Sequence, residues 1–357
     1  MVRQFLEAKS PESAVRAQMA TDRGFDPAVW RQMAGQLGLQ GLAIPEAYGG
    51  SGFGAVELSV VLEEMGRALL CAPYFSTVVL AASALLHCGD EQAKADLLPG
   101  IASGETIATL ALVEDSGRWD EPGVQATAAF RDDGWEITGS KCFVLDAHIA
   151  DLILVAARTA AGVSLFAVDA AAPGLTRTLL PTLDQTRKQA RLDLNRVPCR
   201  LTGTDGAGWQ AVERVLDLAA VALAAEEVGG AQRVLDASVE YAKLRIQFGR
   251  PIGSFQAIKH KCADVLLAVE TARSAAYYAA RCAASLSDEL PPVASLAKAY
   301  CSDAYVRAAS ENIQVHGGLG FTWEHPAHLY LKRAKSSQSM LGTSVYHRER
   351  LADRIGL

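Results

Sequence analysis

The chain has 357 residues, of which 50% are hydrophobic and 21% charged, so it is a packed protein of two or three units and not a disordered one. Its net charge of −6 gives no general attraction to nucleic acid or anionic membranes, so an anionic ligand needs a local cationic site. No apolar run approaches the ~20 residues that span a bilayer, and we expect a cytoplasmic protein. The seven cysteines form no CxxC pair, which predicts buried free thiols and no metal site.

The first 105 residues have the pattern of an N-terminal helical domain. Apolar residues recur at helical spacing, and loops are indicated at Pro45, at the glycines of residues 49–54 and at Pro73. We therefore predict short helices joined by loops over residues 1–105.

Residues 106–205 are predicted to form a β-domain. Six short runs are rich in β-branched or aromatic residues, and turn signals at residues 132–134 and 173–174 separate some of them. The runs are Thr106–Val113, Val124–Phe130, Trp135–Thr138, Asp151–Ala157, Val163–Val168 and Gln189–Leu194. Strands that follow one another without intervening helices favour an antiparallel sandwich or barrel over a parallel sheet.

Residues 206–357 are predicted to form a C-terminal four-helix bundle. Breaks at residues 250–253, at Pro291-Pro292 and at residues 316–320 divide the range into four long helices. One of them carries apolar residues at the spacing of a single buried face, namely Ile258, Cys262, Val265, Leu266 and Val269. The predicted fold class is α+β, in the order helices, strands, helices.

Two C-terminal stretches have the chemistry of a site for a phosphate-bearing ligand. Tyr241–Ala263 reads YAKLRIQFGRPIGSFQAIKHKCA, and Gln314–Arg333 reads QVHGGLGFTWEHPAHLYLKR. A guanidinium such as that of Arg245 suits phosphate oxygens, and the ring of Phe248 offers a face or an edge to an adenosine. Gly317 and Gly318 let backbone approach a ligand where a Cβ would collide, and Gln314 supplies an amide beside them.

These stretches resemble the two most characteristic C-terminal motifs of the acyl-CoA dehydrogenase family, in the same order and at a similar separation. Residues 42–54 resemble the family's N-terminal loop, and Gly139–Lys141 resembles part of its β-domain. The resemblance implies an FAD-dependent α,β-dehydrogenation of an acyl-CoA thioester, a tetramer, and an electron-transfer flavoprotein as electron acceptor. It also implies that Arg245, Phe248, Gln314, Gly317 and Gly318 reach across a subunit interface to the FAD held mainly by a neighbour. For this family the N-terminus looks short, as though the chain begins partway into the first helix.

The chain departs from the family where the catalytic base belongs. The family uses a glutamate at one of two places to remove the α-proton. The first place aligns with Leu341, which cannot accept a proton, although Thr343 nearby could still contact flavin. The second place aligns with Ala219. Glu226 and Glu227 lie about two turns further along and are weak candidates for a replacement base, with structural roles the commoner expectation.

The β-domain shows further departures beside the expected flavin ring. The family's tryptophan-isoleucine-threonine-asparagine becomes Phe143-Val144-Leu145-Asp146, which keeps an aromatic face at Phe143 and loses the threonine hydroxyl at Leu145. Trp119 takes the place of a small serine and argues weakly against a straight-chain substrate pocket. Backbone amides in this stretch could still bond a flavin, because that needs no particular side chain.

Three histidines near the second motif each have a structural and a functional interpretation. His325 and His328 stand at i, i+3, a spacing that can suit a metal, but Pro326 between them favours packing at a helix start. His316 beside Gly317 either approaches the FAD or is a loop residue, and the sequence does not choose.

Three functions remain open at this point. The chain is an FAD-dependent acyl-CoA dehydrogenase of fatty-acid or steroid side-chain β-oxidation, acting alone or as one subunit of an α2β2 enzyme. Alternatively, it is a non-catalytic subunit that completes a partner's FAD site. A third alternative is a flavin monooxygenase or oxidase on the same fold, which would consume oxygen with reduced flavin.

Overall fold

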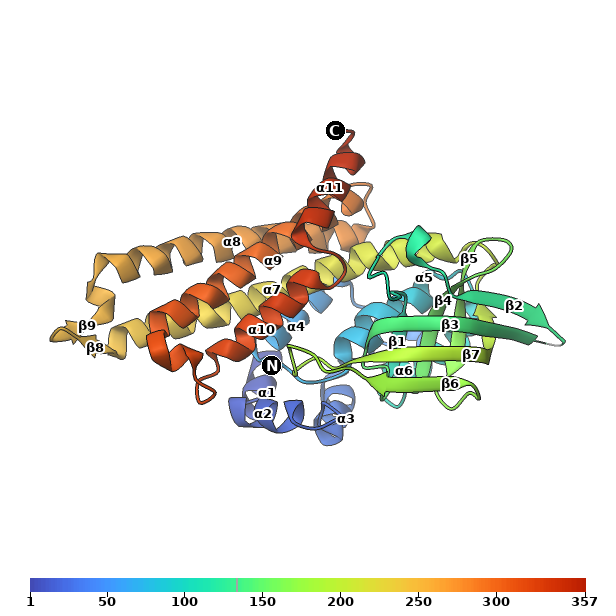
Figure 1. Cartoon of the computed structure of the whole chain (residues 1–357), viewed down its shortest axis with the longest axis horizontal. Helices are drawn as coiled ribbons and strands as arrows, with labels where there is room; N and C mark the ends of the chain where they lie inside the picture. Colours follow the sequence, from blue (N-terminus) through green and yellow to red (C-terminus); the bar gives the residue numbers. More distant parts are fainter. Residues whose placement is uncertain (133) are drawn as a thin grey trace. The chain divides into compact units, whose positions relative to one another are not determined.

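A computed structural model describes residues 1–132 and 134–357 of the chain (Figure 1). Packing groups these residues into two compact units. One contains residues 1–16, 55–70 and 220–357, and the other contains residues 17–54 and 71–219. The predicted helical range 1–105 therefore contributes to both units, and each is described separately below.

The first unit is a helical bundle. Its elements are α1 (Val2–Lys9), α4 (Ala55–Arg67), α7 (Gly208–Leu244, from Ala220 onward), the short strands β8 (Ile246–Gln247) and β9 (Arg250–Pro251), η4 (Ile252–Ser254), α8 (Gln256–Ser285), α9 (Leu290–His316), η5 (Gly317–Phe321), α10 (Ala327–Ser339) and α11 (Ser344–Ile355). Side chains from α7, α8, α9 and α10 form one core. Because all four helices contribute, the predicted four-helix bundle is confirmed, with α11 as an additional short helix.

The buried face of α8 follows the predicted period. Val265 and Val269 are buried, and the face continues through Ala272 and Ala276 at i, i+4, i+7 and i+11. Leu266, which was also assigned to this face, is 48% exposed, so the prediction was wrong at that residue.

The second unit carries the β-domain and several helices. Its elements are α3 (Pro27–Leu37), η1 (Glu46–Tyr48), the π-helix η2 (Phe75–Ala82), α5 (Ser83–His87), α6 (Glu91–Ala102), β1 (Ala108–Ala111), η3 (Glu121–Gly123), β2 (Thr127–Arg131), β3 (Gly134–Leu145), β4 (Leu152–Arg158), β5 (Val163–Asp169), β6 (Leu175–Leu179) and β7 (Gln189–Thr202). The helix α2 (Glu12–Met19) is divided between the units.

The strands of the β-domain close into a ring. The pairings run β4–β2–β3–β7–β5 and return to β4, with β1 added on β4 and β6 added on β7. Most pairs are antiparallel, as expected for a barrel, but β1 and β2 run parallel to β4. The interior is filled by small and branched side chains such as Ile137, Val155 and Phe166.

Some boundaries differ from the sequence-based expectation. The strands β3 and β7 are longer than expected, and β6 was missed because its alternation leaves most residues exposed. The break expected at Pro291-Pro292 lies just before them, between the end of α8 at Ser285 and the start of α9 at Leu290. The two prolines occupy the first turn of α9, which tolerates them because proline lacks only an amide that this turn leaves unpaired anyway. The turn expected at residues 132–134 includes Asp133, which lies outside the described residues.

The Gly139–Lys141 motif has a structural role inside the β-domain. Lys141 is fully buried, and its Nζ donates to Glu114 Oε1 at 2.7 Å and to the Leu112 carbonyl at 3.0 Å. The same carboxylate oxygen accepts the backbone amides of Gln125 and Ala126, both at 2.8 Å. Because both charges are paired and hydrogen-bonded, this buried pair fixes the segment between β1 and β2.

Across the part of the chain that the structure describes, no helix is both long enough and apolar enough to cross a membrane.

Candidate functional site

The two C-terminal motifs meet at one end of the helical bundle. The C-terminal ends of α7 and α9 pack together through Ala242, Ile252 and Val315. The ring of Tyr241 at the end of α7 lies 4.3 Å from the ring of His316 at the end of α9. Figure 1 shows β8 and β9 extending from this end of the bundle. Helix packing therefore brings Arg245 and Phe248 to the same end as Gln314, Gly317 and Gly318.

Arg245 and Phe248 present exposed side chains at the bundle end. Arg245 is exposed and, within the described residues, forms no ion pair. Phe248 is 90% exposed and has a φ of 51°, an unusual value for a residue with a Cβ. Its ring meets Phe255 edge to face at 6.0 Å, and the Arg250 guanidinium lies over Phe255 at 4.2 Å. An exposed aromatic and a free guanidinium on one tip are what an adenosine and a pyrophosphate require.

The Gly317-Gly318 segment is open to a ligand. Gly317 has a φ of 59° and a ψ of −139°, a backbone conformation that suits glycine, and a Cβ on either glycine would meet nothing within 4 Å. The packing of the described residues in this unit therefore leaves room for a side chain at Gly318. Gln314 is exposed one turn earlier on α9. The arrangement leaves backbone accessible, and the residues present fit the phosphate-bearing part of FAD.

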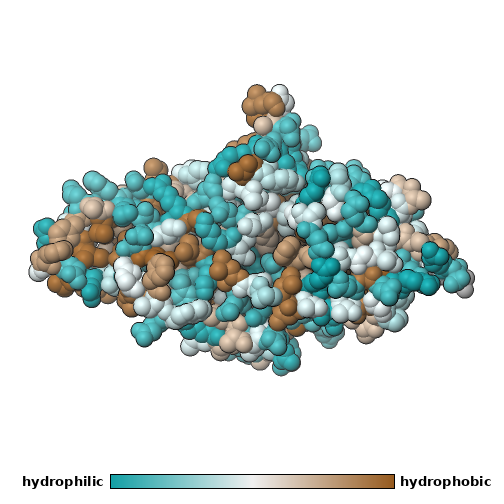
Figure 2. Space-filling view, viewed as in Figure 1, coloured by the Kyte–Doolittle hydropathy of each residue, from teal (hydrophilic) through white to brown (hydrophobic). Residues whose placement is uncertain are grey.

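The surface of this end is apolar around the motifs. Figure 2 shows hydrophobic side chains over the end of the bundle that carries β8 and β9. Large exposed side chains here include Leu244 at 79%, Ile246 at 54% and Phe321 at 82%. Exposed apolar residues gathered around a cationic group are typical of a surface that a partner covers.

His316 is buried at the end of α9 and is not a surface loop residue. It is 5% exposed, its Nδ1 lies 2.8 Å from the Asn312 carbonyl, and its ring lies between those of Tyr241 and His325. Burial lowers the pKa of His316. His325 and His328 pack at the start of α10, and no group of three potential metal-binding side chains occurs among the described residues.

The usual base position is buried and apolar. Leu341 is 3% exposed, lies between α10 and α11, and has a φ of 62°. This left-handed conformation costs a residue with a Cβ about 1–2 kcal/mol, so surrounding contacts must impose it. The second base position, Ala219, is completely buried. Neither position offers a proton acceptor.

Three residues that the sequence did not single out hold the Leu341 loop. His347 Nε2 donates to the Leu341 carbonyl at 3.0 Å. Asp303 accepts from Gln338 Nε2 at 3.0 Å before the loop and from Ser344 Oγ at 2.7 Å after it. Lys298 Nζ donates to the Ser337 carbonyl at 3.0 Å. No sequence signal marked Asp303 and Lys298, because their partners lie about 40 residues away along the chain.

Glu226 and Glu227 are both engaged inside the bundle. Glu226 Oε1 accepts from Arg333 Nη1 at 2.7 Å, with both side chains buried. Glu227 Oε1 accepts from Ser302 Oγ at 2.7 Å and lies 3.9 Å from Lys298 Nζ. Burial lowers the pKa of Lys298, opposed by the charge of Glu227. These contacts agree with the structural role that was the commoner expectation for both glutamates.

The remaining site residues lie elsewhere. Phe143 is 50% exposed with a φ of 56°, at a bulge in the β3–β7 pairing that turns its ring outward. Leu145 is buried, and its carbonyl accepts from Thr109 Oγ1 at 2.7 Å.

Thr343 is exposed and caps α11, accepting from the Tyr346 amide at 3.2 Å. Thirteen residues of α10 separate Thr343 from the Gly317 end, so it belongs to another part of the bundle.

Comparison with known proteins identifies the relatives of this chain. Three family profiles match in order: the acyl-CoA dehydrogenase N-terminal domain over residues 1–105, the middle domain over 109–197 and the C-terminal domain over 206–356. The chain belongs to the acyl-CoA dehydrogenase family. As an acyl-CoA dehydrogenase family flavoprotein, it has FAD as its cofactor, and its fold class is the predicted one.

Individual relatives cover nearly the whole chain. "Acyl-CoA dehydrogenase IpdE2" of Mycobacterium tuberculosis is 37% identical over 92% of this chain and 87% of its own length. The structure described as "Tcur3481-Tcur3483 steroid ACAD G363A variant" superposes with a TM-score of 0.89 at 34% identity, covering 99% of this chain and 95% of that one. The ChsE4-ChsE5 complex from Mycobacterium tuberculosis contains a chain with a TM-score of 0.91 at 31% identity, covering 99% and 95%.

Proposed function

We propose that this chain is one subunit of an α2β2 acyl-CoA dehydrogenase, in which its bundle end completes the FAD site of a neighbouring subunit that carries the catalytic base. The observation that carries the proposal is a contrast between exposed and buried positions of the chain. Arg245 and Phe248 are exposed and available, whereas Leu341 and Ala219, at the two base positions, are buried and apolar.

The bundle end supports a cofactor-completing role. Arg245 would pair with the pyrophosphate, the amides around Gly317 and Gly318 would approach its oxygens, and Phe248 would contact the adenosine side. Bound FAD would supply acceptance of the β-hydrogen of the acyl-CoA as a hydride. The chain's own contribution is to bind and orient the cofactor and to shield it from water.

The base positions argue against independent turnover by this chain. A side chain must lie within hydrogen-bond reach of the proton that it removes, and it must be able to accept that proton. Leu341 fails the second condition, and the carboxylates of Glu226 and Glu227 are held by buried Arg333 and Lys298. The base would therefore come from the partner subunit.

Similarity to two-chain proteins adds to the case. One solved relative is the ChsE4-ChsE5 complex, and another is a steroid ACAD that carries the double designation Tcur3481-Tcur3483. By this similarity the substrate class would be an acyl-CoA with a bulky, steroid-derived acyl group. Electrons would pass to an electron-transfer flavoprotein.

The test compares the chain alone with the chain plus the product of a neighbouring acyl-CoA dehydrogenase gene. We expect the lone chain to be colourless and inactive, and the pair to show a flavin absorption band that an acyl-CoA bleaches anaerobically. A lone chain that holds stoichiometric FAD and turns over acyl-CoA would overturn the proposal. Oxygen consumption by reduced flavin, without electron-transfer flavoprotein reduction, would instead support the monooxygenase or oxidase alternative.

A control variant tests whether a loss of FAD is specific to the bundle end or follows from any loss of a surface arginine. Arg245→Ala should lower the FAD content of the pair, while Arg281→Ala, an exposed arginine on α8, should leave it unchanged. If both variants lose FAD equally, the effect is not specific to the bundle end.

A further inference from the structure

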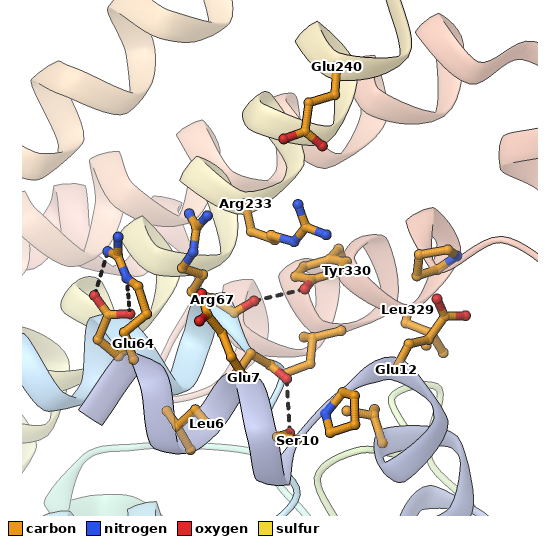
Figure 3. Close-up of a pocket in the computed structure, with 16 residues that line it drawn as sticks. Leu6, Glu7, Ser10, Glu12, Glu64, Arg67, Arg233, Glu240, Leu329 and Tyr330 are labelled. Carbon is orange, nitrogen blue, oxygen red and sulfur yellow. Dashed lines mark hydrogen bonds and ion pairs between the residues drawn. The ribbon is translucent and has the colours of Figure 1, made fainter. Parts of the chain in front are cut away.

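The helical unit contains a pocket that the cofactor motifs do not line. It has a volume of about 420 Å³, within the range of small-molecule sites. Helices α1, α4, α7 and α10 and the start of α2 contribute to its walls (Figure 3). None of Arg245, Phe248, Gln314, Gly317 or Gly318 is among the lining residues.

The pocket has an apolar floor. Leu6, Val15, Leu69 and Leu329 line it, and each is at most 3% exposed. These four side chains come from different segments of the chain and form the apolar part of the lining. An apolar ligand body of roughly eight to ten carbons would gain about 25 cal/mol for each Å² of apolar surface that it buries there.

Most charges around the pocket are already paired. Arg3 donates to both oxygens of Glu64 at 2.8 and 2.7 Å. Arg67 Nη1 donates to Asp236 at 2.8 Å, and Glu12 accepts from Arg16 at 2.7 Å. These ion pairs involve lining residues of α1, α2 and α4.

Among the described residues, Arg233 is the arginine of this pocket that forms no ion pair. Its side chain is half-buried in the pocket wall. Figure 3 shows Arg233 beside Tyr330. The Tyr330 hydroxyl donates to the Arg67 carbonyl at 2.8 Å, and its oxygen accepts a side-chain hydrogen bond from Arg233. The pocket therefore presents one guanidinium without an anionic partner above an alkyl floor.

The rim limits the charge of any ligand. Glu7, Glu12 and Glu240 also line the pocket. Glu240 lies seven residues beyond Arg233 on α7, a rise of about 10 Å along the helix. A ligand with several negative charges would meet these carboxylates, whereas a single negative charge can sit on Arg233 alone.

We propose that this pocket is a second ligand site, which takes a singly charged carboxylate with an apolar body. The carboxylate accepts from the Arg233 guanidinium, and the apolar body lies on Leu6, Val15, Leu69 and Leu329. Acyl-CoA thioesters are excluded because their phosphates carry several negative charges. The proposal does not depend on the partner-subunit role, since every residue it uses belongs to this chain.

The test is calorimetric titration of the full chain with octanoate, octanol and octylamine, which share one alkyl body and differ in charge. We expect octanoate to bind with 1:1 stoichiometry and the other two to bind at least ~10-fold more weakly. Arg233→Met should weaken octanoate by a similar factor, and Arg233→Lys by less. Arg281→Met is the matched control on α8 and should change affinity less than twofold.

A second variant keeps the Arg233 guanidinium and fills part of the pocket with a larger side chain. Leu329→Phe should weaken octanoate binding while circular dichroism shows an unchanged helical content. Equal binding of octanol or octylamine would overturn the carboxylate assignment, and unchanged affinity in Arg233→Met would overturn the role of Arg233. Binding of octanoyl-CoA in an Arg233-dependent manner would overturn the charge limit. No saturable octanoate binding at millimolar concentration would overturn the site itself.

Discussion

The bundle end and the Leu341 loop are the two places in the helical unit where a member of this family is expected to be functional. They differ in exposure, since the bundle end is open to solvent and the loop is buried. At the bundle end, Arg245 forms no ion pair with any described residue and Phe248 is 90% exposed. At the loop, Leu341 is 3% exposed in a left-handed conformation, and His347 donates a hydrogen bond to its carbonyl. The first region therefore presents side chains to solvent, whereas the second is buried and hydrogen-bonded within the bundle.

The largest expected effect concerns the buried ion pair near the loop. Arg333→Met leaves Glu226 buried without its partner and should lower the free energy of unfolding by about 3–5 kcal/mol. Chemical denaturation measures the change. In the double variant with Glu226→Gln the loss should be much smaller, and additive losses would show that the two charges do not depend on each other.

The next effect is pH-dependent stability at the same loop. Burial and nearby Lys298 lower the pKa of His347 to about 3, well below its unfolded value near 6.5. The unfolded state therefore binds the proton first, so stability is complete above pH ~6.5 and falls by about 1.4 kcal/mol per pH unit below it. The variant His347→Gln should lose about 2.3 kcal/mol less than the parent between pH 6.5 and 4.5. Parallel pH profiles for the two proteins would contradict this assignment.

A smaller effect is expected at the bundle end, and it should be in function and not in folding. Arg245→Ala should weaken FAD retention in the assembled pair by ~10-fold or more through loss of charge-assisted hydrogen bonds. The unfolding midpoint of the lone chain should stay unchanged, because Arg245 forms no ion pair among the described residues. A destabilised lone chain with normal FAD retention would reverse the comparison.

The smallest effect is expected for a conservative change at the former base position. Leu341→Met preserves volume and polarity, so turnover of the assembled pair should change less than ~2-fold. A steady-state assay with electron-transfer flavoprotein as acceptor measures this. A large loss in kcat at unchanged stability would mean that the loop touches reacting groups.

Some of these features were readable in the sequence and others were not. The helix–strand–helix order, the four-helix bundle and the family followed from local periodicity and from two contiguous motifs. The strand β6 and the exposure of Leu266 on α8 were missed, because local patterns do not show which face a neighbouring element covers. The helix boundary expected at Pro291-Pro292 was found, because a proline pair is tolerated in the first turn of a helix and not in its interior.

The sequence by itself determined that the usual glutamate is missing at Leu341 and Ala219, because identity at a motif position is a local property. It also determined that Arg245 and the Gly317 segment remain. Only the tertiary structure decided that Glu226 and Glu227 are held by Arg333 and Lys298, and that Arg233 faces a pocket without an acidic partner. The reason is that pairing and burial depend on residues tens to hundreds of positions apart, which only the packing of helices brings together.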